Sequence, residues 1–225
     1  MQIGGVQKTS LLDFPDKIST IVFTQGCNFR CGYCHNPELI HKNQPAWTNA
    51  GFFEFLKSRQ GKLDGVVITG GEPCLQKDLI EFIKEIKSLG FLVKLDSNGT
   101  FPDVLEKAIP YLDYIAMDIK APLEKYKNIV GVNIDTQTIK NSINMIMSSN
   151  VDYEFRTTVV KSQLSIDDFS EIANLICGAK RYYLQKFVPT KTLDESFMKL
   201  ETYSDEEFKV IISILSKQLQ NVYLR

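Results

Sequence analysis

The stretch STIVFTQGCNFRCGYC, residues 19–34, joins a short run of β-branched residues to a loop that carries three cysteines. The run over residues 19–25 is typical of a buried strand. Three thiols at spacings of four and three, in a loop that contains glycine, are able to fold around one metal group. The stretch therefore predicts a strand that leads directly into a metal-binding loop.

The same alternation of strand and helix continues outward from this stretch. Strands are predicted over residues 19–25, 65–69, 92–97, 114–118, 153–160 and 182–188. Helices are predicted over residues 50–58, 76–89, 101–109, 136–149, 167–177 and 205–218. Six such units predict a parallel α/β sheet with right-handed crossovers, either open and doubly wound or curled into an arc.

The length of the chain favours the arc. A complete eight-unit barrel takes about 250 residues, and this chain has 225. We therefore expect an α/β fold of the incomplete (β/α)6 TIM-like barrel type. We expect it to form a single domain over residues 1–225, with a core at about 18–190 and a closing helix at about 204–220.

Composition narrows the class of protein. Hydrophobic residues make up 44% of the chain, charged residues make up 24%, and the formal net charge is −1. These values are typical of a folded globular protein, and they disfavour non-specific electrostatic binding to nucleic acid or to a membrane surface. Neither a secretory signal pattern nor an apolar run of membrane-spanning length is visible. We expect a cytoplasmic protein that binds no nucleic acid and no membrane.

Unusual polar motifs follow the first four predicted strands. In order along the chain they are Gly26-Cys27, Gly70-Gly71-Glu72-Pro73, Asp96-Ser97-Asn98-Gly99 and Asp118-Ile119-Lys120. The carboxyl ends of parallel strands share one edge of the sheet, which is where such folds collect their reactive groups. Four motifs are therefore predicted to converge on one rim.

The chemistry of the cysteine motif has two interpretations from the residues alone. Four thiolates complete an ordinary 4Fe-4S site, and here only Cys27, Cys31 and Cys34 are local. A structural zinc site would instead need His35 or Cys74 as its fourth ligand. The spacing favours iron and sulfide but leaves zinc open. Cys74 is predicted to pack beside a helix start, and Cys177 is predicted to belong to the core.

The cysteine spacing, with an aromatic residue before the third cysteine and Gly-Gly-Glu-Pro after the next strand, resembles the radical S-adenosylmethionine (SAM) enzymes. The resemblance implies that Cys27, Cys31 and Cys34 are the metal ligands of a catalytic 4Fe-4S cluster whose fourth iron is chelated by SAM. It also implies reductive cleavage of SAM to methionine and a 5′-deoxyadenosyl radical that abstracts a hydrogen atom.

The resemblance further implies contacts with SAM. The backbone of Gly70, Gly71, Glu72 and Pro73 would bind the methionine ammonium, with Glu72 acting as a scaffold for the turn. Asp96, with Ser97 and Asn98, would lie beside the ribose, or Asp96 would bind a monovalent cation. Lys120 would pair with the SAM carboxylate, and Asp118 with its ammonium. Tyr33 would lie near the adenine, and Gln185 near the adenosine end together with Arg156 and Phe187.

These contacts have plainer alternatives. Residues 96–99 could form only an Asx-type turn, and the Asp118–Lys120 pair could be an exposed ion pair. Burial or pairing inside the barrel would explain Arg156, Gln185 and Phe187 equally well.

Two longer stretches, VQKTSLLDFP at residues 6–15 and FTQGCNFRCGYCHNPEL at residues 23–39, are similar to activating enzymes of glycyl radical enzymes. They are most like the activating proteins of anaerobic ribonucleoside-triphosphate reductases and are also similar to pyruvate formate-lyase activating enzyme. The resemblance implies a glycyl radical enzyme as protein substrate and a flavodoxin- or ferredoxin-type electron donor. The alternatives are a radical SAM enzyme of the 7-carboxy-7-deazaguanine synthase type, which acts on a small molecule, and a zinc-binding scaffold without catalysis.

Overall fold

The computed structural model describes residues 1–41, 43 and 45–225. Over these residues, eight strands form one sheet in chain order. They are β1 (Ile3–Ser10), β2 (Ser19–Thr24), β3 (Gly65–Gly70), β4 (Leu92–Ser97), β5 (Tyr114–Asp118), β6 (Asp152–Val159), β7 (Tyr182–Lys186) and β8 (Val222–Leu224). Strand β1 is antiparallel to β2, and every later pair of neighbours is parallel.

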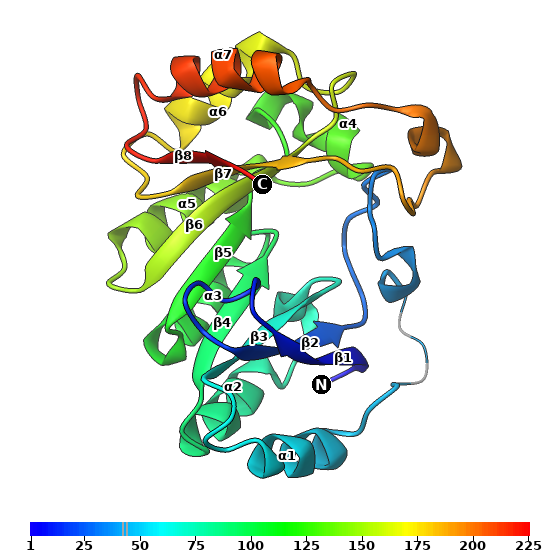
Figure 1. Cartoon of the computed structure of the whole chain (residues 1–225), viewed down its shortest axis with the longest axis vertical. Coiled ribbons are helices and arrows are strands. Elements are labelled where there is room, and N and C mark those ends of the chain that lie inside the picture. The colour runs from blue at the N-terminus through cyan, green and yellow to red at the C-terminus, as the bar shows by residue number, and fades with distance from the viewer. Residues whose placement is uncertain (42, 44) are drawn as a thin grey trace.

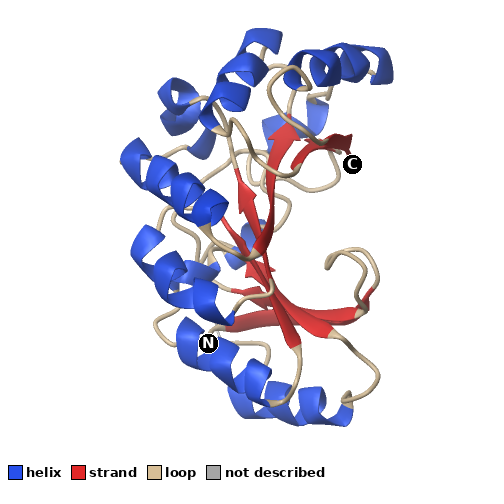
Figure 2. Ribbon diagram, turned by 90° about the vertical axis from the view of Figure 1, so that its left-hand side faces the viewer, coloured by secondary structure: helices blue, strands red, loops and turns tan. Residues whose placement is uncertain are grey.

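Helices cover the outer, convex face of the sheet, and no described helix covers its inner, concave face (Figure 2). They are α1 (Asn49–Ser58), α2 (Leu79–Ser88), α3 (Pro102–Ala108), α4 (Tyr126–Val130), α5 (Thr136–Ser148), α6 (Ile166–Leu175) and α7 (Asp205–Leu215). Strands β1 and β8 lie at the two edges of the curved sheet and do not pair with each other (Figure 1). The predicted incomplete (β/α)6 barrel is confirmed, because each of β2 to β7 is followed by a helix.

Alternation along the strands separates a core face from a cavity face. On β6, Tyr153 and Phe155 are buried in the core, while Arg156 and Thr158 are only partly buried and face the concave side. At the other end of the barrel, Phe14 and Tyr114 belong to a small buried apolar cluster. The polar side chains that line the main cavity gather instead at the carboxyl ends of the strands.

Several boundaries differ from the sequence predictions. Strands β1 and β8 and helix α4 were not predicted, because residues 3–10 are rich in glycine and polar side chains and the other two elements are short. Helix α2 begins at Leu79 rather than residue 76, because Gln76 leaves the helical path and its side-chain amide donates to the Gln25 carbonyl at 2.8 Å. Helix α7 occupies the predicted position but ends at Leu215.

The prediction that Cys177 belongs to the core is wrong. Helix α6 ends at Leu175, so Cys177 lies in the following turn and is exposed. The buried positions on this side are taken by Ile172 and Ile176. Cys74 is buried, as predicted.

Within the described part of the chain, none of the helices combines the length and the apolar character that crossing a membrane requires.

Candidate active site

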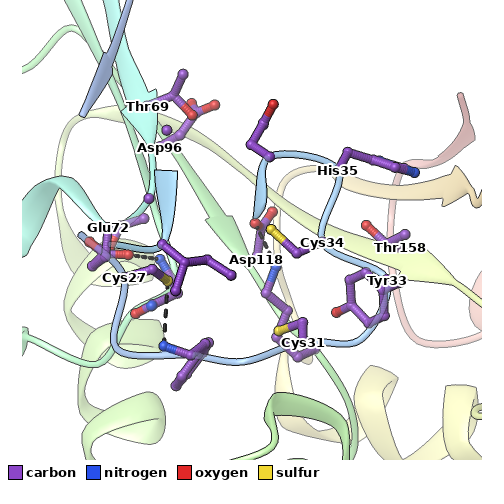
Figure 3. Close-up of a pocket in the computed structure, with 18 of the residues that line it drawn as sticks. Cys27, Cys31, Tyr33, Cys34, His35, Thr69, Glu72, Asp96, Asp118 and Thr158 are labelled. Carbon is purple, nitrogen blue, oxygen red and sulfur yellow. Dashed lines mark hydrogen bonds and ion pairs between the residues drawn. The ribbon is translucent and has the colours of Figure 1, made fainter. Parts of the chain in front are cut away.

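A single cavity lies where the carboxyl ends of the parallel strands meet the cysteine loop, residues 27–34 (Figure 3). Its lining comprises Cys27, Phe29, Cys31, Tyr33, Cys34, His35, Asn36, Ile40, Thr69, Gly70, Gly71, Glu72, Asp96, Ser97, Asn98, Asp118, Lys120, Arg156, Thr158 and Gln185. The four motifs that were predicted to converge on one rim therefore do so.

Two of the residues that were predicted to lie beside SAM, Phe187 and Pro73, do not line the cavity. Phe187 is buried and stacks on the His35 ring. Pro73 is buried and opens a 3-10 turn, Pro73–Leu75. Its fixed φ suits the first position of a turn, so it shapes the segment that presents Glu72.

The sequence analysis missed several lining residues, including Phe29, Thr69 and Thr158. Thr158 lies two positions after Arg156 on β6, and period-two alternation would have assigned it to the same face. Phe29 has no such signal, because it lies within an irregular loop.

Backbone hydrogen bonds fix the cysteine loop at its start and in its middle. The N–H of Gly26 donates to the Leu39 carbonyl at 2.7 Å, and the N–H of Cys27 donates to the Ile40 carbonyl at 3.0 Å. Further along, the N–H of Arg30 donates to the carbonyl of Val130 in α4 at 2.7 Å. The loop is therefore anchored to residues outside itself and holds a defined shape.

The thiols of this loop sit in an environment that disfavours their charge. Burial raises the pKa of Cys27 to about 12, although the Phe29 N–H, 3.4 Å from its sulfur, acts in the opposite direction. Burial also raises the pKa of Cys31, which Lys120 partly offsets. Thiolates at these positions need an additional positive group that binds them.

The donor set fits an iron–sulfur cluster better than a single ion. Zinc holds each thiolate at about 2.3 Å in one tight tetrahedron and needs a fourth ligand beside the three cysteines. In a 4Fe-4S cluster each thiolate binds a different iron, so Cys27, Cys31 and Cys34 would hold three irons and leave the fourth for another ligand. Figure 3 shows Cys27, Cys31 and Cys34 on the loop that borders the cavity, and Glu72 and Asp118 among the other lining residues.

The two residues that zinc would need as fourth ligand are engaged elsewhere. The sulfur of Cys74 lies 3.6 Å from the Ser97 hydroxyl and does not line the cavity. The His35 ring stacks on Phe187 with centroids 5.7 Å apart, and its Nε2 lies 2.9 Å from the Val188 carbonyl oxygen. These contacts disfavour both residues as a fourth zinc ligand.

Opposite the cysteine loop, five charged side chains form a chain of ion pairs that we call the charged floor. Lys94 Nζ lies 2.5 Å from Asp96 Oδ1, and Arg156 Nη1 lies 3.1 Å from Asp96 Oδ2. Arg156 Nε lies 2.9 Å from Asp118 Oδ1, and Lys120 Nζ lies 2.9 Å from Asp118 Oδ2. The Asp118–Lys120 pair is thus part of an inward-facing network rather than an exposed surface pair.

These pairs keep the carboxylates ionised. Burial alone would raise the pKa of Asp118, but Arg156 and Lys120 outweigh it and lower the pKa to about 2. Burial likewise opposes the charge of Asp96, and Arg156 with Lys94 lowers its pKa below the ordinary value. The pKa of Lys120 is raised well above its ordinary value despite burial, chiefly by Asp118. The charged floor thus presents permanent charges to the cavity.

Glu72 joins the ends of two strands. Its carboxylate accepts from the N–H of Cys74 at 3.0 Å, the hydroxyl of Ser97 at 2.9 Å and the N–H of Asn98 at 2.7 Å. Burial raises its pKa, and these donors oppose the shift. These contacts support the scaffold role predicted for Glu72, because its lone pairs are used within the protein.

Gly71 allows close backbone approach at the same turn. A Cβ at this position would lie 2.2 Å from the Gly26 carbonyl oxygen, far inside van der Waals contact. The turn after β3 therefore packs directly on the start of the cysteine loop.

Residues 187–199, which we call the cover segment, pack on the outer side of the cysteine loop. The Phe197 ring lies 6.4 Å from the Tyr33 ring and 6.5 Å from the Phe187 ring, measured between centroids. The N–H of Asp194 donates to the Gly32 carbonyl at 3.0 Å. This segment had no recognisable motif in the sequence, yet it supports the loop that carries the cysteines.

Comparison with known proteins identifies the family of this chain. The family model of the Radical SAM superfamily matches residues 21–176. A protein of Methanocaldococcus jannaschii, described provisionally as a glycyl-radical enzyme activating enzyme, is 36% identical and covers 99% of this chain and 95% of its own length. The pyruvate formate-lyase-activating enzyme of Clostridium pasteurianum is 28% identical, over 85% of this chain and 83% of its own.

Solved structures support the fold. SuiB of Streptococcus suis, bound to the precursor peptide SuiA, superposes with a TM-score of 0.69 at 12% sequence identity over 90% of this chain. The match covers 47% of SuiB, so this chain spans about half the length of that protein.

Proposed function

Because this chain belongs to the radical SAM superfamily, and within it to the glycyl-radical enzyme activating enzymes, we propose that it activates an anaerobic ribonucleoside-triphosphate reductase. The reaction abstracts a hydrogen atom from a backbone glycine of that partner and leaves a glycyl radical. The observation that carries the proposal is the convergence of the cysteine loop and the strand-end motifs on one cavity in a sheet that does not close.

Cys27, Cys31 and Cys34 would hold a 4Fe-4S cluster in this cavity. When bound, the cluster supplies the electron that cleaves SAM. The protein would contribute position and charge. The buried side chains of the cysteine loop, Phe29, Cys31 and Tyr33, would limit access of water to the cluster. The cover segment would keep Tyr33 and the cysteine loop in place.

The charged floor and the turn after β3 would bind SAM. Lys120 would pair with its carboxylate, and Asp118 with its ammonium. The backbone of Gly70 and Gly71, which line the cavity, would approach the methionine portion of SAM. Through its three hydrogen bonds, Glu72 would hold this turn in a fixed position relative to the end of β4.

The remaining lining residues would enclose the nucleoside. Asp96, Ser97 and Asn98 lie at the end of β4 and would face the ribose. Tyr33 would lie beside the adenine, and Gln185 on β7 beside the adenosine end.

The substrate would enter through the gap between β1 and β8. A small-molecule enzyme gains from a fully closed cavity, whereas a polypeptide loop needs an open side. We further propose that residues 1–225 act as one domain, since all eight described strands share one sheet. A flavodoxin- or ferredoxin-type protein of the cytoplasm would supply the electron.

The test uses protein reconstituted anaerobically with iron and sulfide, reduced and mixed with SAM. Formation of 5′-deoxyadenosine is measured by chromatography, and the partner reductase is then added while electron paramagnetic resonance follows the glycyl radical. A glycyl radical doublet supports the proposal. Nucleoside formation without that radical, together with turnover of a pterin-derived substrate, would instead assign the chain to the 7-carboxy-7-deazaguanine synthase type.

A further inference from the structure

The charged floor contains two carboxylates whose oxygens are all matched by fixed cations. Asp96 Oδ1 faces Lys94 at 2.5 Å, and Asp96 Oδ2 faces Arg156 at 3.1 Å. Asp118 Oδ1 faces Arg156 at 2.9 Å, and Asp118 Oδ2 faces Lys120 at 2.9 Å. Three side-chain cations thus bind the two carboxylates through four contacts.

Lys94 is the member of this network that does not line the cavity. It lies on the same face of β4 as Asp96, two residues earlier, and its side chain is only 2% exposed. Its Nζ lies 6.0 Å from the centre of the Tyr114 ring on the neighbouring strand. A buried ammonium requires a counter-ion, so Lys94 and Asp96 hold each other in place from behind the cavity wall.

A free monovalent cation at Asp96 does not fit this arrangement. Each Asp96 oxygen retains a second lone pair, but an ion bound there would lie beside the Lys94 ammonium or the Arg156 guanidinium. Repulsion between like charges at such separations is strong in a poorly solvated site. A free ion brings no anion that offsets this repulsion, whereas the SAM ammonium proposed for Asp118 would arrive with the carboxylate that Lys120 would bind. The Lys94 ammonium already occupies the position beside Asp96 that a free cation would fill.

We propose that the ammonium of Lys94 acts as a built-in cation that orients Asp96, so that this chain binds SAM without K⁺ or Na⁺. Lys94 is therefore a positioning residue for Asp96. The consequence for SAM rests on the proposed function, whereas the consequence for ion binding does not.

Ion binding is measured first, on the full-length, cluster-loaded protein without SAM. Thallium(I) serves as the probe for K⁺ and is followed by ²⁰⁵Tl NMR in tetramethylammonium chloride. The unmodified protein is expected to show no saturable thallium binding, and Lys94→Met is expected to show binding that KCl displaces. Lys94→Arg, which keeps the charge, should behave as the unmodified protein does.

The matched control is Lys87→Met. Lys87 also pairs with an aspartate, Asp113, at 2.7 Å, but neither residue lines the cavity. This variant should bind no thallium. Saturable thallium binding by the unmodified protein, or its absence in a folded Lys94→Met variant, would overturn the inference.

SAM affinity is the second readout. In the unmodified protein, the Kd for SAM should differ by less than about twofold between KCl and tetramethylammonium chloride, and in Lys94→Met it should be about tenfold tighter in KCl. If Lys94→Met does not fold, the unmodified protein decides, because K⁺-dependent SAM affinity contradicts the inference and K⁺-independent affinity supports it. Complete failure to bind SAM would reject the proposed function while leaving the thallium result valid.

Discussion

The two sides of the cavity satisfy their polar groups in opposite ways. On the charged floor, every oxygen of Asp96 and Asp118 already has a cationic partner within the protein. In the cysteine loop, burial raises the pKa values of Cys27 and Cys31, and the recorded donor to Cys27 sulfur is one N–H at 3.4 Å. The carboxylates of the charged floor have their counter-ions in the folded protein. The thiolates of the cysteine loop gain a counter-ion only when the loop binds a positively charged group. The comparison teaches that the floor is preorganised, while the loop is a receptor.

Removing one thiol from the cysteine loop should abolish binding of the cluster. We expect Cys31→Ala to lose the cluster and all 5′-deoxyadenosine formation, because Cys27 and Cys34 are already cluster ligands and no further described cysteine lines the cavity to replace Cys31. Iron and sulfide content and product chromatography measure the loss. Cys177→Ala, at an exposed cysteine, should retain both, and a Cys31→Ala protein that still cleaves SAM would reject the site.

The protonation state of the cluster-free loop provides a second check. With its pKa raised to about 12, Cys27 should alkylate slowly with iodoacetamide. Against an ordinary thiol of pKa about 8.5, it carries roughly three-thousandfold less thiolate near neutral pH. Mass spectrometry of labelled peptides compares Cys27 with the exposed Cys177. Equal rates at pH 8 would contradict the described burial.

The same shift has a consequence for stability. The folded pKa of Cys27 lies above the unfolded value, so its contribution is fully present below about pH 8.5 and is lost as the pH rises toward 12. Cluster-free protein should therefore lose stability in that window, and Cys27→Ser should lose less.

On the preorganised side, a single substitution should weaken binding without removing the cluster. Lys120→Ala leaves one oxygen of Asp118 without its cation and removes the partner proposed for the SAM carboxylate. A charge-assisted hydrogen bond of about 1.5–3 kcal/mol corresponds to roughly 10- to 100-fold in SAM affinity. Calorimetric titration of SAM measures the change, with Lys87→Ala as the control outside the cavity. Unchanged affinity would mean that Lys120 does not contact SAM.

The smallest effect on stability should come from an ion pair that belongs neither to the cysteine loop nor to the charged floor. Lys191 in the cover segment lies 2.6 Å from Glu38, and both side chains are more than half exposed. Lys191→Ala should change the free energy of unfolding by less than about 1 kcal/mol. Denaturant unfolding of the cluster-loaded protein measures this value. A larger loss would show that the cover segment depends on this pair rather than on its aromatic contacts.

The strand-end motifs were predictable because alternation in a parallel sheet brings consecutive strand ends to one edge. The same reasoning placed Asp118 and Lys120 on one face, and applied to β4 it would also have paired Lys94 with Asp96. Arg156 could not be assigned in the same way. Its contact with Asp96 depends on the curvature that brings β6 toward β4, which no local pattern records.

The cover segment and Cys177 show two other limits of sequence reasoning. Residues 187–199 have neither helical nor strand periodicity, and a backbone hydrogen bond from Asp194 to Gly32 ties them to the cysteine loop independently of side-chain type. The core assignment of Cys177 failed because the helical pattern was continued past the end of α6 at Leu175.

An unclosed sheet has two edges, and exposed strand edges invite pairing with other chains. Here both are blunted. Strand β1 has two register irregularities and a bridge from Ile3 to Trp47, and β8 is three residues long. A polypeptide between β1 and β8 would find few unpaired backbone groups with which to form a further strand. Its recognition must therefore come from side chains rather than from strand addition. The molecule can thus remain open without becoming a template for aggregation.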